Sequence, residues 1–459
     1  MFRLSCLLLI CLGLFSTRVN AVENTSLVSQ LSMGADTCTE TLDKEGDLVA
    51  VARRHDGCVL VDVSDPENPS IITTINPDDR VPNATPSIDI WDVDIHNGYL
   101  YMMNRGEAVD PLLNNWVGLY IYDIAVPNSP VLEGWLLWGG GIYHHLAGSV
   151  HAGTVADING IPHAFLCSDI TGDVEIFNVM IPSAPIFITS IFSPGYFSQA
   201  CEVVVQNDRL FSAWGDDGFT IHDVALLPLQ PDLVLHQPYI GAAVINGGLR
   251  TLCPTPDGNH LVTGEYTLQG DVRLWDISNL GTDAQVNQSL VQLVDSWKLD
   301  TGAILWTVRA TDDFAFVAHL EDGLQVLDIR DRSGLSTIGC FDPDSGSPVT
   351  TWAGIADVVV EGTRLFASHQ TDGLYVVDFG GQVEITKAQW WNKKKRLTVW
   401  ATASNQPDAN LELVGYGPMA WNNKRKHYEK IVSNVSSNPG LVIVVSDLTG
   451  FDDAIVTAR

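Results

Sequence analysis

The sequence predicts an all-β protein, namely a seven-bladed β-propeller closed by an N-terminal outer strand and followed by a small C-terminal β-sandwich. Three observations carry this prediction. One short strand motif recurs along most of the 459 residues, a hairpin precedes each copy of it, and the balance of charge changes near residue 382. Almost every segment alternates apolar and polar residues with the period of a strand, and hardly any has the period of a helix.

The recurring motif is a glycine turn followed by a strand of alternating β-branched and aromatic residues that ends in Asp or Asn. Its copies are 57–62, 118–123, 172–178, 218–223, 270–276, 323–328 and 373–378. A hairpin such as 201–213 comes before each copy, and a proline-containing turn and a further strand such as 63–75 follow most of them. Four short strands per repeat, joined by Gly, Asn-Gly and Asp-Gly turns, are typical of a propeller blade.

The two ends of the repeat region complement each other. The seventh copy reaches residue 382 without an outer strand, whereas 26–33 is a strand that belongs to no repeat. An incomplete seventh blade would expose an unpaired sheet edge, and such edges promote aggregation. We therefore expect 26–33 to pair with the strand at 373–378 and to close the ring.

Two segments resemble a known family. Residues 59–69, VLVDVSDPENP, and residues 374–378, LYVVD, are similar to the LVIVD-repeat family of exported β-propeller proteins. The similarity extends over about 26–382 and is weakest in the third to fifth repeats. It implies a propeller fold and a secreted or surface location, and it implies no catalytic residues.

The chain ends extend this organisation. Residues 1–21 have Arg3, an apolar run and Val19-Asn20-Ala21, as in a secretory signal peptide. We expect a secreted, periplasmic or cell-surface protein with no transmembrane segment in its mature part. The propeller would span 22–382. Residues 383–459 contain several short strands and suit an immunoglobulin-like β-sandwich.

Charge separates these two parts and restricts the class of partner. Lys and Arg number 13 against 48 Asp and Glu in 22–382, but 10 against 7 in 383–459, and the whole chain has a net charge of −30. A nucleic-acid partner is excluded, because it requires a clustered basic surface. Six cysteines follow residue 21, and both free thiols and one to three disulfides are compatible with their wide spacing.

Two long insertions identify a candidate ligand-binding face. Residues 104–117 lie inside the second repeat and residues 137–151 lead into the third, and propeller topology places both connections on the same side of the ring. Loops on a rigid scaffold commonly carry binding function. The expected ligand contacts are Trp116, Trp138, Tyr143, His144, His145 and His151. The alternative is that these loops only pack over a wide junction between blades.

Four carboxylates are candidates for a cation site on the axis. Alignment of the inner strands by their turns places Glu40, Asp92, Glu202 and Asp357 at one equivalent position, with Ala152, Leu252 and Thr307 in the other repeats. Such a ring could hold a cation, of which calcium is the natural choice. The favoured alternative is that these carboxylates accept hydrogen bonds from main-chain amides of the neighbouring inner strand.

These observations predict a non-catalytic binding or surface-interaction protein that presents loops to a protein or a glycan. The alternative is an enzyme, either a metal-dependent oxidoreductase or a hydrolase, with its site at the mouth of the propeller channel and His144, His145 and His151 as metal ligands. The enzyme is the less favoured of the two, because no nucleophile elbow, phosphate-binding loop or dinucleotide fingerprint is present.

Overall fold

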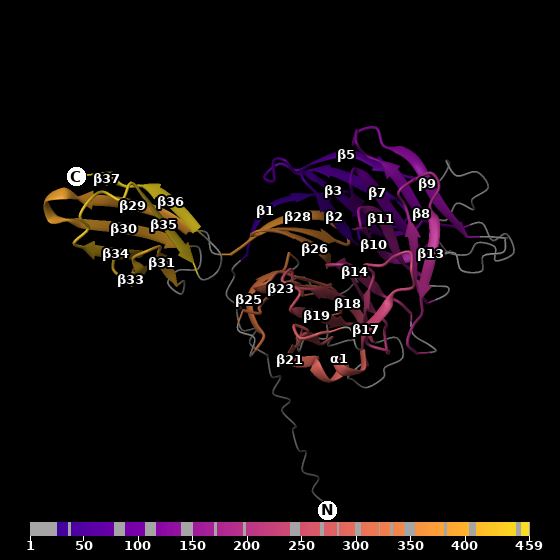
Figure 1. The fold of residues 1–459 in the computed structure, drawn as a ribbon. Helices are drawn as coiled ribbons and strands as arrows, with labels where there is room; N and C mark the ends of the chain where they lie inside the picture. The colour runs from indigo at the N-terminus through magenta and orange to yellow at the C-terminus, as the bar shows by residue number, and fades with distance from the viewer. Residues whose placement is uncertain are drawn as a thin grey trace, which may run out of the picture.

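The structure is a computed structural model, and it describes residues 25–34, 38–77, 88–105, 116–138, 150–168, 172–195, 199–238, 248–266, 270–281, 284–298, 304–320, 322–330, 334–343, 354–380, 383–403, 410–446 and 451–458. The fold is all-β, and the sheets formed by residues 25–380 are arranged around a common centre as in a β-propeller (Figure 1). No helix in these ranges is long and apolar enough to cross a membrane.

Between residues 25 and 380 the described strands form seven four-stranded antiparallel sheets. The first three are β2 (Leu42–Glu45), β3 (Leu48–Ala52), β4 (Cys58–Asp62) and β5 (Ser70–Ile75); β6 (Ile90–His96), β7 (Tyr99–Asn104), β8 (Trp116–Asp123) and β9 (Val131–Trp138); and β10 (Val150–Ile158), β11 (Ile161–Ser168), β12 (Val174–Asn178) and β13 (Ile186–Ile191). The next two are β14 (Glu202–Gln206), β15 (Arg209–Ala213), β16 (Phe219–Asp223) and β17 (Asp232–Gln237), and β18 (Leu249–Pro254), β19 (His260–Glu265), β20 (Val272–Asp276) and β21 (Gln292–Trp297). A short helix, α1 (Ala284–Leu290), joins β20 to β21.

The last two sheets of this region are β22 (Leu305–Ala310), β23 (Phe314–His319), β24 (Gly323–Asp328) and β25 (Ser336–Phe341), and β26 (Ile355–Glu361), β27 (Arg364–His369), β28 (Gly373–Phe379) and β1 (Thr25–Leu31). In the last sheet β1 pairs antiparallel with β28, from Thr25 opposite Phe379 to Leu31 opposite Leu374. The N-terminal strand therefore takes the outer place in the sheet formed by the seventh repeat.

Apolar side chains hold consecutive sheets together. Each of seven hydrophobic clusters contains buried residues from two neighbouring sheets. One of them joins the first sheet to the last and includes Val59, Val61, Phe366 and Val376. The innermost strands β2, β6, β10, β14, β18, β22 and β26 contact one another in that order, and β26 contacts β2.

Close backbone contact explains the glycine that opens the motif strand in the first and seventh repeats. At Gly57, where φ is +78°, a Cβ atom would lie 2.0 Å from the carbonyl oxygen of Ile75 in the outer strand β5. At Gly373, where φ is +103°, it would lie 2.4 Å from the carbonyl oxygen of Leu31 in β1. Both positions need a residue without a side chain. The likeness of the two contacts shows that β1 stands where β5 stands in the first sheet.

The C-terminal residues form two further sheets around a core of their own. One sheet has β33 (Ala420–Asn422), β34 (His427–Ser433), β30 (Arg396–Ala403), β29 (Val383–Trp391) and β37 (Thr457–Ala458) in that order. The other has β32 (Gly417–Pro418), β31 (Leu411–Leu413), β35 (Leu441–Ser446) and β36 (Phe451–Ile455). Leu397 and Val399 of the first sheet and Leu413 and Val444 of the second belong to one buried cluster.

Candidate functional site

A β-bulge occurs near the start of the innermost strand in five of the seven sheets. The pairing of these strands with their neighbours skips one residue each time, namely Trp91, His151, Arg250, Trp306 and Ala356. In the first and fourth sheets Glu40 and Cys201 take the same place, because their N–H groups donate to the carbonyls of Ala52 and Ala213 at 3.0 and 2.8 Å. We call these seven residues the bulge positions. A bulge redirects a side chain away from the regular alternation of a strand.

The residue after each bulge position returns to regular pairing. These residues are Thr41, Asp92, Ala152, Glu202, Thr251, Thr307 and Asp357, and we call them the first paired positions. In the first sheet, for example, the N–H of Ala52 donates to the carbonyl of Thr41 at 2.9 Å. Two layers of side chains are thus defined at one end of the channel.

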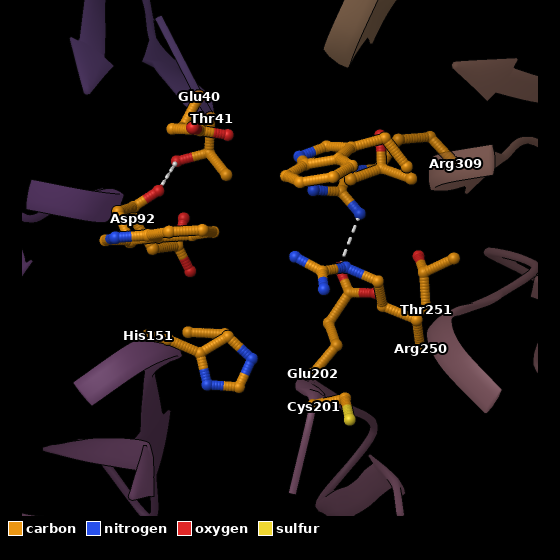
Figure 2. Close-up of a pocket in the computed structure, with 13 residues that line it drawn as sticks. Glu40, Thr41, Asp92, His151, Cys201, Glu202, Arg250, Thr251 and Arg309 are labelled. Atoms are coloured by element: carbon orange, nitrogen blue, oxygen red, sulfur yellow. Dashed lines mark hydrogen bonds and ion pairs between the residues drawn. The ribbon is translucent and has the colours of Figure 1, made fainter. Parts of the chain in front are cut away.

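These two layers enclose one cavity, which Figure 2 shows. Its lining consists of the bulge positions except Ala356, the first paired positions except Asp357, and Arg309. The free space between the lining atoms is about 420 Å³, part of which is open to solvent. The cavity lies where the innermost strands begin, and we call this end of the sheets the channel mouth.

The hydrogen bonds correct the alignment of the inner strands that the sequence suggested. Thr41 and Thr251, not Glu40 and Leu252, are in register with Asp92 and Asp357. The alignment from the sequence was therefore off by one position in these two sheets. Glu40 is therefore a bulge residue, and its carboxylate lies in a different layer from those of Asp92 and Glu202.

Carboxylates in the first paired layer bind the main chain of the next sheet. The N–H of Gly153 donates to Asp92 at 2.9 Å, and that of Leu252 donates to Glu202 at 2.9 Å. Thr251 plays the same part with its hydroxyl, which accepts from the N–H of Val308 at 3.0 Å. These bonds satisfy amides that the innermost strands leave without a ladder partner. The sequence analysis favoured this hydrogen-bonding role over a cation site.

Arg309 joins two of the four carboxylates. Its guanidinium lies 2.7 Å from Glu202 and 3.0 Å from Asp357, which is fully buried and does not line the cavity. The hydroxyl of Thr307 also donates to Asp357 at 3.0 Å. Burial by itself lowers the pKa of Arg309, but the charges of Asp357 and Glu202 more than offset it and raise this pKa. The guanidinium thus takes the place that a cation would occupy between these two groups.

Burial changes the protonation of the remaining carboxylates. It raises the pKa of Asp92 to about 7, although the N–H of Gly153 opposes the shift. It also raises the pKa of Glu40, against the opposing charge of Arg54. Near neutral pH the cavity therefore contains carboxyl groups that bind protons far more readily than exposed ones do.

Tryptophan and arginine side chains gather at the channel mouth. Trp91 and Trp306 are stacked with 6.4 Å between ring centroids, and Tyr266 meets Trp306 edge to face at 5.8 Å. The guanidinium of Arg250 lies 4.3 Å above Trp306, and those of Arg54 and Arg105 lie 4.1 and 4.3 Å above Trp91. Such contacts hold a guanidinium flat against a ring while its N–H groups remain at the edge.

The predicted ligand-binding residues are placed as follows. His151 lines the cavity, and the main chains of Trp116 in β8 and Trp138 in β9 pair with each other. Tyr143, His144 and His145 lie outside the described residues. Of the predicted metal ligands, Glu40, Asp92 and Glu202 line the cavity, whereas Asp357 is behind it. Within the ranges that the structure describes, no three His, Cys, Asp or Glu side chains are arranged to hold a metal ion.

Sequence reasoning missed the arginines and tryptophans of the cavity. Trp91 and Trp306 each precede a first paired position, and Arg309 follows Thr307 by two residues on the same side of β22. A correct alignment of the repeats would have shown these equivalences. All six cysteines after residue 21, whose pairing was left open, are free thiols in the structure.

Comparison with known sequences identifies two repeats. The family described as "LVIVD repeat" matches residues 45–76 and 305–342, which include the motif strands β4 and β24. These are the first and sixth copies of the motif. The match supports the similarity to this family over those two segments. No curated protein matches the chain in sequence.

Comparison with solved structures identifies the fold. A chain described as "Structure of U3-55K" has a TM-score of 0.53 and 12% identity, and the match covers 77% of this chain and 98% of that one. A chain described as "Crystal structure of RRP9 WD40 repeats" has a TM-score of 0.53 and 12% identity, with 78% and 99% covered. At this identity the likeness concerns architecture alone, and it agrees with a propeller-like arrangement of four-stranded sheets.

Proposed function

We propose that this chain is a binding protein that docks a protein ligand on its channel mouth. One observation carries the proposal: the bulge positions of four inner strands bring Glu40, Trp91, Arg250 and Trp306 into one open cavity, which six of the sheets line. Side chains of these types, anchored on rigid strands, are typical of residues that dominate binding energy. A propeller-like repeat scaffold suits such a role.

The ends of the strands that flank the two long insertions, 104–117 and 137–151, also point to the channel mouth as the binding face. Asn104, at the end of β7, is opposite Ile90, and Val150, at the start of β10, is opposite Ser168. Strand β7 therefore ends, and strand β10 begins, at the channel mouth. Asn104 also bonds both flanking chains there, since its side chain accepts from the N–H of Asp89 and donates to the carbonyl of Val117, each at 2.7 Å.

The chemistry of the cavity favours recognition over catalysis. A nucleophilic cysteine requires a lowered pKa, whereas burial raises the pKa of Cys38, which contacts the cavity residue Glu40 without itself lining the cavity, to about 12. Glu202 and Asp357 are both bound to Arg309, and Asp92 is bound to the main chain. These carboxylates already bind groups in other sheets. Their contacts therefore keep the walls of the cavity rigid and leave them no catalytic role.

We extend the proposal to the organisation of the chain. Seven blades in a closed ring would explain the pairing of β1 with β28 and the cluster that joins the first and last sheets. A domain boundary at 382 and a β-sandwich over 383–459 would explain the separate core of the C-terminal sheets. Export rests on the signal-like residues 1–21 alone, which lie outside the described residues. The N-terminal sequence of protein recovered after secretion would test it.

Selection from a peptide-display library tests the binding proposal. Full-length protein lacking residues 1–21 would be the bait, and selected peptides would then be assayed against two loop variants. In the first variant, residues 106–115 are replaced by a four-residue Gly-Ser linker. In the second, a matched control, Asp65 and Glu67 are replaced by Ser in the turn between β4 and β5, at the opposite end of the sheets.

We expect selected peptides to lose at least tenfold in affinity for the first variant and to bind the control unchanged. Equal binding to both variants would contradict docking on the channel mouth. Failure to select any peptide, combined with retention of the protein on a glycan array, would replace the protein ligand by a glycan.

A further inference from the structure

We propose that the cavity binds a carboxylate group, presented by an acidic side chain or the C-terminus of the protein ligand, and that Arg250 is its anchor. The inference rests on the proposed function and adds the chemistry that the ligand must bring. It follows from the pairing state of the charged groups that line the cavity.

Arg250 is a cation that the described part of the molecule leaves without an acceptor. Its guanidinium packs 4.3 Å from the ring of Trp306 and 4.9 Å from that of Tyr266, and it forms no hydrogen bond or ion pair among the described residues. Ring contacts fix the plane of a guanidinium but use none of its five N–H donors. These donors line the cavity, where Figure 2 shows the side chain of Arg250 beside Glu202.

Arg309 and Arg54 at the channel mouth differ from Arg250, because each already has acceptors. Arg309 is bound to Glu202 and Asp357, and Arg54 is bound to Glu40 and, through two nitrogens, to Asp89. Neither can bind an external anion without giving up a carboxylate that it already holds. Arg250 can do so at no such cost.

A second, independent group points to the same ligand. Atom Oε2 of Glu40 is buried and has no hydrogen-bond partner in the described part of the chain, while Oε1 contacts Arg54 at 3.2 Å and the thiol of Cys38 at 3.3 Å. Glu40 lines the cavity, is 2% exposed, and lies within electrostatic range of Arg250. With a proton on Oε2, Oε1 would still accept from Arg54 and Cys38, and a ligand carboxylate would accept from the Oε2–H of Glu40 and from Arg250.

A single carboxylate on a protein fits better than a polyanion. The net charge of −30 repels a chain of negative charges from a distance, whereas a lone carboxylate on a neutral or basic partner escapes most of this repulsion. An acidic sugar would also gain from open aromatic faces, but guanidinium groups already lie over Trp91 and Trp306. An acidic side chain or chain terminus needs only the guanidinium edge.

Matched peptides test the inference in the full-length protein. The probes are N-acetyl-Ala-Asp-Ala-amide, its Asn counterpart, N-acetyl-trialanine with a free carboxylate, and the amide of that peptide. Affinities would be measured by titration of the 15N-labelled protein, following the indole N–H signals of Trp91 and Trp306. We expect each carboxylate peptide to bind at least tenfold more tightly than its uncharged counterpart.

Two variants assign the effect to Arg250. Arg250→Met retains contact with Trp306 but lacks the charge, and we expect it to abolish the preference for the carboxylate peptides. Arg250→Lys retains the charge without the planar fork, and should keep a reduced preference. The matched control is Arg330→Met, because Arg330 also lies over a ring, 5.2 Å from Phe314, yet occupies the turn after β24 at the opposite end of the sheets.

Three outcomes would overturn the inference: equal binding of Asp and Asn peptides, an unchanged preference in Arg250→Met, or displacement of the peptides by galacturonate at lower concentration. The last would assign the site to an acidic glycan. If peptides selected by display depend on the channel mouth but contain no required carboxylate, the proposed function stands and this inference alone fails.

Discussion

At the scale of single residues, the repeat motif ends in Asp or Asn because that side chain organises the next turn. The N–H two residues further on donates to Asp62, Asp123, Asn178, Asp223, Asp276 and Asp328, at 2.8 or 2.9 Å in every case. This contact is an Asx turn, which mimics a main-chain turn. In the seventh copy no such turn follows, and Asp378 instead accepts from Arg364 at 2.8 Å.

The protonation of Asp92 predicts a pH dependence of stability. Its folded pKa of about 7 exceeds the ordinary value of 3.8, so the folded state binds more protons than the unfolded state between these values. Its contribution to stability is therefore greatest at low pH and declines as the pH rises through 7, by roughly 4 kcal/mol at most. Asp92→Asn should remove this decline and keep the acceptor for Gly153. Parallel slopes of unfolding free energy against pH for the two proteins would contradict this assignment.

The arginine bridge predicts a strong coupling. Arg309→Met leaves Asp357 buried without its cation, and we expect a loss of about 2–4 kcal/mol in the free energy of unfolding. A second change, Asp357→Asn, should recover part of that loss, since it removes the uncompensated charge. Urea titrations of the four proteins in this cycle measure the coupling energy between the two residues. A value near zero would mean that the bridge does not contribute.

At the scale of elements, the strands could be predicted and their exact register could not. The motif strand of every repeat was recognised because its glycine, alternation and terminal acid all have local causes. The bulges have no such local cause. The residues that they skip differ in chemistry, from Trp91 in one sheet to Ala356 in another. For this reason the layer of bulge positions was not recognised, and Trp91, Trp306 and Arg250 were missed.

Close packing at Gly373 predicts a local defect in the last sheet. In Gly373→Ala the new methyl group meets the carbonyl of Leu31, so β1 must move away. We expect a loss of more than about 2 kcal/mol and faster hydrogen exchange in β1. The matched control is Gly362→Ala, where φ is +61° and no atom lies within 4 Å of the new Cβ. This control should cost only about 1 kcal/mol, and equal losses in both variants would exclude the contact as the cause.

At the scale of the whole molecule, the sheets depend on a strand from the far end of the sequence. The all-β, propeller-like class followed from the repeats, whereas the domain boundary expected near residue 382 from the charge difference stays a prediction. Ligand identity has no comparable signal. It depends on which side chains converge from six sheets, and that convergence is a property of the assembled fold.

Removal of the N-terminal strand should destabilise the last sheet. A protein that begins at residue 34 exposes the outer edge of β28, and we expect its melting temperature to fall by roughly 5–10 °C and its aggregation to increase. A synthetic peptide of residues 24–33 should restore both properties when added in excess. An unaltered melting temperature in the truncated protein would show that β1 contributes no stability.

The pairing of Thr25 with Phe379 also sets an order of events during synthesis. The ribosome releases β1 at the beginning of translation, yet the partner strand emerges only after almost the whole repeat region has been made. Until then β1 and the first sheets lack their final neighbour. Joining segments so distant in sequence costs conformational entropy, which makes this pairing a late step in folding. A nascent chain with this topology remains unfinished through most of its elongation. Any factor that acts on it at that stage acts on an open array of sheets.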